Sequence, residues 1–197
     1  MDRRRLILGL SALATPAAAQ APGWQARLVA AAESQVGRTL TYDPAYTRLA
    51  YPNGDVPLAR GVCTDVVIRA YRTAFGLDLQ KLVHEDMAAN FARYPRLWGL
   101  KRPDRNIDHR RVPNLETFLR RRGASLPLPA GPATLQAGDL VTQRLPGNLP
   151  HILIVHHRRA AGRPLAVHNI GQGARLEDAL FDHPIVGWFR FAPPARG

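Results

Sequence analysis

The sequence has 197 residues, and 27 Lys and Arg against 15 Asp and Glu give it a formal net charge of +12. This length suits one domain with a hydrophobic core. The positive charge favours anionic surroundings such as phosphate-bearing polymers, acidic peptides or lipid head groups. No nucleic-acid-binding motif accompanies the charge, and a single cysteine without an HExxH pattern does not predict a zinc site.

The N-terminal segment has the features of a signal peptide over residues 1–19. Three arginines at 3–5 precede a short apolar run, and three alanines at 17–19 suit cleavage. The apolar run is too short to span a bilayer, so we expect no stable membrane anchor. Export by a Sec or twin-arginine signal would place residues 20–197 in the periplasm, which argues against a nucleic-acid partner.

Apolar residues at helical spacing predict helices over 24–36, 79–93 and 114–122, and one that begins near Cys63 and stops at Gly76. The segments between them, 38–60 and 94–112, are expected to be loops. Four strands are predicted after residue 132, over 139–144, 151–156, 165–169 and 185–191. Helices followed by an antiparallel meander indicate the α+β class.

Cys63 is the only cysteine, and Gly61 places it near the start of its helix. A thiol at a helix N-terminus lies at the positive end of the peptide dipole, which favours the nucleophilic thiolate. The alternative is a small buried apolar residue without a chemical role. A lone cysteine in an exported protein cannot form an internal disulfide, so the pattern favours a functional thiol.

A thiol that attacks acyl groups needs an imidazole base and a polar group that orients this base. His151 begins the second strand and His168 lies near the end of the third, so a turn over 158–163 would bring them together. We therefore predict Cys63 as nucleophile, His151 as base and His168 as orienter. Asn169 is the alternative orienter, because adjacent strand residues point to opposite faces.

A metal site and a cofactor are not expected. His151 and His157 would share a strand face but lie roughly 20 Å apart along it.

Substrate contacts are predicted for a few residues around this set. The loop tyrosines Tyr42, Tyr46 and Tyr51 would line a site or attach their loop to the core. Asp65 would cap its helix or contact a substrate amine. Segment 94–112 is a solvated loop or faces the substrate. From these features we select the following candidates: Tyr51, Asp65, His109, Arg110 and Asn169.

The strand motifs AGDLV (137–141), PHILIV (150–155) and AVH (166–168) resemble the strand block of NlpC-type papain-like cysteine peptidases. More closely, the segments YPNGDVP (51–57), GVCTDVV (61–67), NIDHRRV (106–112) and VHNIG (167–171) resemble an exported bacterial family, domain-of-unknown-function family 1287. The first resemblance implies a papain-like α+β fold. Two features differ from that group: Val62 stands where it has Asp before the cysteine, and residues 79–123 look like an insertion.

We therefore expect residues 20–197 to be a single-domain, monomeric thiol hydrolase, a cysteine peptidase or amidase. The resemblance implies amide bonds of peptidoglycan peptides or another envelope amide as substrate. Transpeptidation or other acyl transfer would use the same groups. The alternative is a non-catalytic envelope-binding protein that holds an anionic polymer on the basic residues of 101–111 and 120–122.

Overall fold

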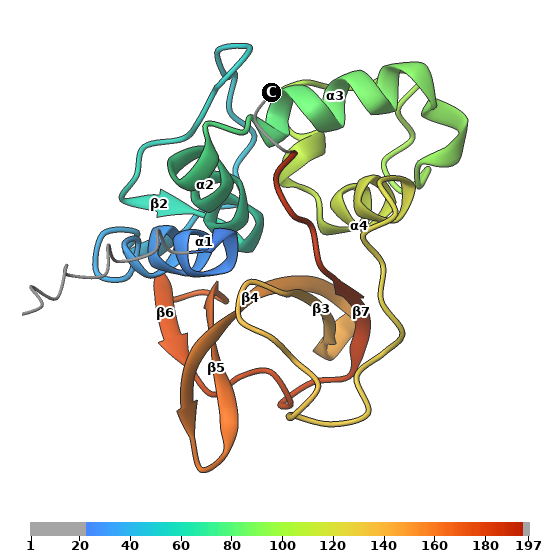
Figure 1. Cartoon of the computed structure of the whole chain (residues 1–197). Coiled ribbons are helices and arrows are strands. Elements are labelled where there is room, and N and C mark those ends of the chain that lie inside the picture. Colours follow the sequence, from blue (N-terminus) through green and yellow to red (C-terminus); the bar gives the residue numbers. More distant parts are fainter. Residues whose placement is uncertain (1–22, 195–197) are drawn as a thin grey trace, which may run out of the picture.

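A computed structural model describes residues 23–194 (Figure 1), so the predicted signal peptide lies outside the described residues. The helices are α1 Trp24–Glu33, α2 Cys63–Phe75, α3 Leu79–Ala89 and α4 Val112–Arg121, with 3-10 turns at Phe91–Arg93, Asp108–Arg110 and Pro146–Asn148. The strands are β1 Thr41–Tyr42, β2 Arg60–Gly61, β3 Leu140–Leu145, β4 Leu149–Ala160, β5 Arg163–Asn169, β6 Ala174–Glu177 and β7 Ile185–Phe189. Across residues 23–194, no helix has both the length and the apolar character needed to cross a membrane.

Five strands form one antiparallel sheet in the order β6-β5-β4-β3-β7, and β1 and β2 form a separate parallel pair. Strands β3 to β6 follow one another as a meander, and β7 returns to pair with β3. Helices that precede an antiparallel sheet confirm the predicted α+β class.

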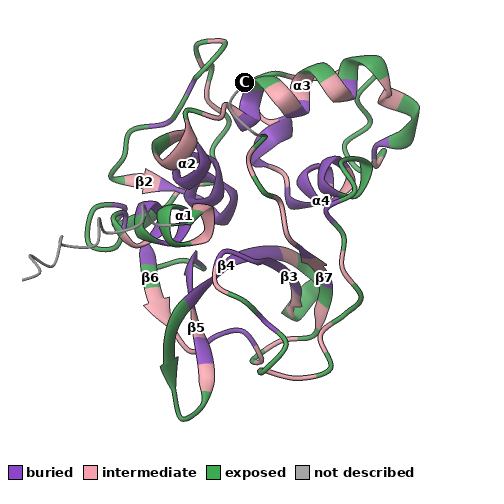
Figure 2. Cartoon of the chain, in the orientation of Figure 1, coloured by how far each residue is buried: buried purple, intermediate pink, exposed green. Residues whose placement is uncertain are grey.

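The two faces of the sheet are covered differently. Ile152, Ile154 and Val167 lie on the face that packs against the helices. Leu153 and Val155 alternate with them and pack on the other face, beneath loop residues. Strand β4 is therefore buried on both faces over much of its length, as its apolar run predicts (Figure 2). Each of these fully buried side chains stabilises the fold by about 1.5–3 kcal/mol.

Helix α2 lies beside α1, and α3 and α4 form a second helical group (Figure 1). The start of α2 is fixed by the Asp65 carboxylate, which accepts a hydrogen bond of 2.7 Å from the Val62 backbone N–H. Its end is at Gly76, whose φ of 68° is readily adopted only by glycine. The predicted bounds of this helix are confirmed, and they place Cys63 at its first residue.

The other elements depart from the prediction at their ends. Helix α1 stops at Glu33 and not at residue 36, because the chain turns there, and Val36 is exposed. Helix α3 stops at Ala89, and a 3-10 turn follows it. Strand β6 is missing from the prediction, which treats these four residues as part of a connection. A four-residue edge strand is held mainly by its partner, so its own sequence pattern is weak.

Candidate active site

A cavity of about 540 Å³ lies beside the first residue of α2. Cys63 and His151 both contribute to its lining, from α2 and from the beginning of β4. Its walls come from four separate parts of the chain: the stretch from Tyr42 to Tyr46, the segment that runs from Trp98 to Pro113, the turn between β3 and β4, and Ile170 after β5. The insertion predicted over 79–123 therefore supplies one wall of this cavity.

The two predicted histidines are in direct contact. His151 Nε2 lies 2.8 Å from His168 Nδ1, although 17 residues separate them in the sequence. The other ring nitrogen of His168, Nε2, lies 2.9 Å from Glu177 Oε1 on β6. All three side chains project from neighbouring strands of the sheet.

This chain of contacts determines which ring nitrogens carry protons. A carboxylate only accepts hydrogen bonds, so His168 must donate its Nε2–H to Glu177. Nδ1 of neutral His168 is then an acceptor and takes the Nε2–H of His151. Nδ1 of His151 is left with a free lone pair. The arrangement thus leaves an unprotonated imidazole nitrogen on a residue that shares the cavity with the Cys63 thiol.

Burial keeps these groups uncharged. It raises the pKa of the Cys63 thiol to about 12, and the backbone N–H groups of Ile152 and Thr64 oppose this shift. Burial also lowers the pKa of His151 to about 3, and the nearby His168 adds to this effect. The pKa of His168 is lowered by burial as well, against the opposing influence of Glu177. The helix position alone favours a thiolate, whereas the buried site favours a thiol beside a neutral imidazole.

Tyr42 supplies a hydrogen-bond donor to the same cavity. Its pKa is raised to about 12, first by burial and then by the neighbouring acidic groups of Cys63 and Asp65. The phenol is therefore protonated at neutral pH and donates its hydrogen. Of the two roles predicted for this residue, lining a site or attaching its loop to the core, the structure provides the first.

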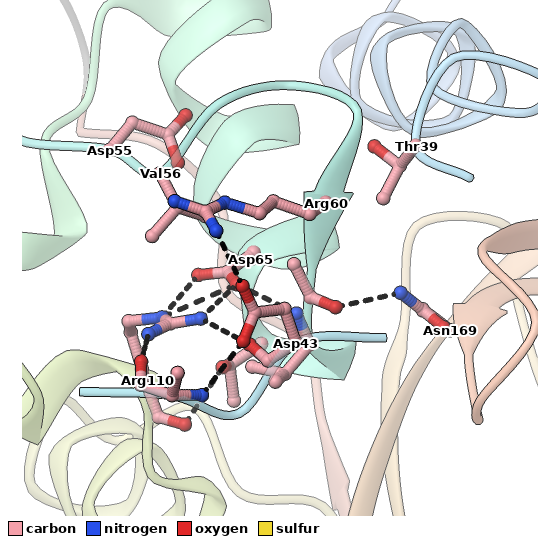
Figure 3. A network of polar contacts seen from close by, with 12 residues as sticks. Thr39, Asp43, Asp55, Val56, Arg60, Asp65, Arg110 and Asn169 are labelled. Atoms are coloured by element: carbon pink, nitrogen blue, oxygen red, sulfur yellow. Dashed lines mark hydrogen bonds and ion pairs between the residues drawn. The ribbon is translucent and has the colours of Figure 1, made fainter. Parts of the chain in front are cut away.

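Arg110 lines the cavity, but its guanidinium is already engaged. It donates to Asp65 Oδ1 and Oδ2 at 3.0 and 2.9 Å, and to the carbonyl oxygens of Asp43 and Ala45 (Figure 3). The side chains of Arg110 and Asp65 are only 2% and 4% exposed. Of the two roles considered for Asp65, the structure provides the helix cap and adds a buried ion pair.

The remaining predicted contact residues lie outside the cavity lining. Asn169 donates to the Gly61 carbonyl at 2.9 Å, so it ties the end of β5 to the segment before Cys63 (Figure 3). It points away from His168, as residues on opposite strand faces do. His109 is buried, and burial lowers its pKa to about 3. Tyr51 packs its ring edge against His84, 5.2 Å between centroids.

Two residues that the sequence reasoning leaves unassigned belong to the site. Glu177 orients His168, and Trp98 lines the cavity under Arg111, whose guanidinium carbon lies 4.0 Å from the indole centroid. The signal for Glu177 is a carboxylate shortly after the strand that carries His168. Residues 23–194 contain no group of three or more His, Cys, Asp or Glu placed to hold a metal ion.

Comparison with known proteins identifies the family. The family described as "Domain of unknown function (DUF1287)" matches residues 29–191, and the chain belongs to it. The chain is 58% identical over 161 residues to "Uncharacterized protein YijF" of Escherichia coli (strain K12), an alignment that covers 81% of this chain and 78% of the relative. The matched region contains the cysteine, both histidines and Glu177. The predicted resemblance to this family is confirmed.

Proposed function

We propose that this DUF1287 protein is a thiol hydrolase that cleaves amide bonds, with Cys63 as nucleophile and His151 as general base. The observation that carries the proposal is the hydrogen-bonded series from Glu177 through His168 to His151, which ends beside the thiol cavity. A buried pair of imidazoles in one fixed tautomer is what proton transfer from a thiol needs. The two hydrogen bonds of His168 keep that tautomer in place.

The first chemical step forms an acyl-enzyme. Cys63 Sγ attacks the substrate carbonyl carbon, and its proton passes to His151 Nδ1. The positive charge on the imidazole is stabilised by His168 and, through it, by Glu177. The N–H groups at the start of α2 and the Tyr42 hydroxyl stabilise the negative oxygen of the tetrahedral intermediate. The C–N bond then breaks, and the leaving amine takes the proton from His151.

The second step releases the acyl group. A water molecule attacks the thioester carbon, and His151 Nδ1 takes a proton from that water. The C–S bond breaks, the proton returns to sulfur, and a carboxylic acid leaves. An amine that replaces water in this step turns hydrolysis into acyl transfer.

The substrate we propose is an amide in the peptides of the bacterial cell wall. The predicted export places the protein where this polymer is found, and the motifs of 137–168 resemble those of NlpC-type peptidases. The cavity supports a peptide ligand, because it is wide enough for several side chains and mostly apolar at Trp98, Leu149 and Ile170.

The rate of Cys63 alkylation by iodoacetamide tests the catalytic pair without a known substrate. We expect the wild-type rate to be nearly constant from about pH 4 to about pH 7, because His151 is neutral above about pH 3 and accepts the thiol proton in this range, and to rise above about pH 8, where unassisted thiolate reacts faster in both proteins. In His151→Ala the unassisted thiolate fraction sets the rate, which then rises about tenfold per pH unit. At about pH 6 the variant should react about 100-fold more slowly than the wild type.

His157→Ala is the matched control, because this histidine lies on the same strand but is exposed. Its profile should follow that of the wild type. A wild-type rate that rises steadily with pH and does not change in His151→Ala would contradict the proposal, and the envelope-binding alternative would then take its place.

Glu177→Gln should lower the alkylation rate at neutral pH by about 10- to 100-fold. The glutamine amide can donate to His168 Nε2. His168 then carries its proton on Nδ1 and donates it to His151 Nε2, so the proton of His151 lies on Nδ1 and the free lone pair of that nitrogen is lost. Nitrogen NMR of labelled histidine measures this tautomer directly. Asp178→Asn is the control, because it removes a neighbouring charge that pairs with Arg163 instead. Equal losses in both variants would show that charge, and not the tautomer, is what matters.

A further inference from the structure

A second cavity of about 280 Å³ lies next to the thiol cavity. The two share Pro113, at the start of α4, and Pro150, at the start of β4. His151 follows Pro150 directly, so the second cavity borders the strand end that carries the proposed base.

The second cavity differs from the first in its charge. Arg144 and Arg120 both line it, and both contact the same carboxylate, that of Glu116. The contacts are long: Arg144 Nη1 and Nη2 lie 3.4 Å from the two Glu116 oxygens, and Arg120 Nη2 lies 3.5 Å from Oε2. The Glu116 side chain is 5% exposed, whereas those of Arg144 and Arg120 are 29% and 51% exposed.

These contacts leave one positive charge uncompensated. In the thiol cavity each arginine has its own carboxylate, since Arg110 pairs with Asp65 and Arg111 with Asp108. In the second cavity two guanidiniums share one buried carboxylate. Both retain N–H donors beyond those that Glu116 and the Gln143 carbonyl occupy, because a guanidinium has five, and both side chains are partly exposed.

We propose that the second cavity is a subsite for a carboxylate of the substrate, so that the enzyme acts on acidic peptides. This inference rests on the proposed function of Cys63 and extends it to substrate choice. A carboxylate in the cavity would complete a set of two guanidiniums and two carboxylates. Guanidiniums suit this task because their planar donors match the two oxygens of a carboxylate.

N-chloroacetyl peptide amides test the subsite. Cys63 Sγ displaces chloride from the probe, so a C–S bond forms, the C–Cl bond breaks and the thiol proton is lost to His151. Two series carry either Glu or Gln at the first, second or third residue after the chloroacetyl group, since each extended residue adds about 3.3 Å of reach. Mass spectrometry of Cys63 gives the second-order rate of inactivation for each probe.

At one of the spacings the Glu probe should inactivate the wild type about 5-fold faster than its Gln counterpart. Arg144→Gln and Arg120→Gln should each reduce this preference, and Glu116→Gln, which removes the competing carboxylate, should increase it. Arg120 is largely exposed, so its variant keeps the test valid if Arg144→Gln folds poorly. Arg159→Gln removes a charge from the exposed end of β4 and should leave the preference unchanged.

Equal rates for Glu and Gln probes at every spacing would overturn the subsite. A preference that Arg159→Gln reduces as much as Arg120→Gln would also overturn it, because net charge would then explain the result. Iodoacetamide distinguishes these outcomes from failure of the proposed function. If iodoacetamide labels Cys63 rapidly and the rate depends on His151, the catalytic pair is supported even though the subsite is not. If labelling is slow and independent of His151, both the catalytic pair and the subsite are contradicted.

Discussion

Cys63→Ala should lower the rate of amide hydrolysis by about 10⁴-fold or more, since removal of a catalytic nucleophile in other hydrolases costs up to about 10⁶-fold. Alanine keeps the helix start and removes only the sulfur of a residue that is 3% exposed and packs against the core. No other cysteine in the sequence can replace it. Release of new amino groups from purified peptidoglycan measures the effect, with peptides of stated sequence as defined substrates.

A control is needed because Cys63 also belongs to the hydrophobic core. The midpoint of urea unfolding should move little in Cys63→Ala, since the volume lost is one sulfur atom. A variant that keeps its fold and loses its activity supports the nucleophile. Full activity in Cys63→Ala would refute the mechanism, whatever the substrate is.

Asp65→Asn should lower the free energy of unfolding by about 3–5 kcal/mol, because it leaves the buried Arg110 guanidinium without its counter-charge. Asparagine offers one acceptor oxygen where the carboxylate offers two, so either the Val62 backbone N–H, which now donates at 2.7 Å, or the Arg110 guanidinium loses an acceptor. Both effects act at the start of α2, one or two residues from the thiol. Urea denaturation followed by circular dichroism measures the change, and the alkylation rate of Cys63 reports whether the site moves.

The double variant Asp65→Leu, Arg110→Met is the matched comparison. Replacement of both partners removes the unpaired charge, so it should be less destabilised than Asp65→Asn alone. If the double variant loses more stability than the single one, the ion pair is not the source of the effect. Arg60→Gln, at an exposed pair with Asp43 in the same network, should cost about 1 kcal/mol or less.

Much of the fold is determined by local patterns in the sequence. Apolar residues at helical spacing and the stop at Gly76 define α2, and the β-branched run after His151 defines β4. The contact between His151 and His168 also follows from a local feature of the sequence, the short turn that joins their strands. Two strands joined by a short turn must pair antiparallel, so residues at matching positions on one face become neighbours. The candidate nucleophile, base and orienter therefore follow from sequence patterns alone.

Other parts of the site depend on residues that are far apart in the sequence. Arg110 meets Asp65 across 45 residues, and Trp98 reaches the cavity from the segment inserted before α4. Glu177 faces His168 only because β6 folds back beside β5, and the register of that short strand is set by its partner. Asp65 is an example of what the sequence leaves open. A carboxylate two residues after Cys63 can cap the helix or contact a substrate, and only the buried contact with Arg110 distinguishes the two roles.

The sequence by itself determined the helices and the longer strands, the helix position of Cys63 and the pairing of the two histidines, because each follows from periodicity or from a short connection. The tertiary structure decided the protonation states, the cavity and its charges. A pKa depends on desolvation by every layer packed around the group, and here burial outweighs the helix dipole at Cys63. A cavity likewise exists only where distant segments meet, and no local pattern specifies which charges they leave unpaired.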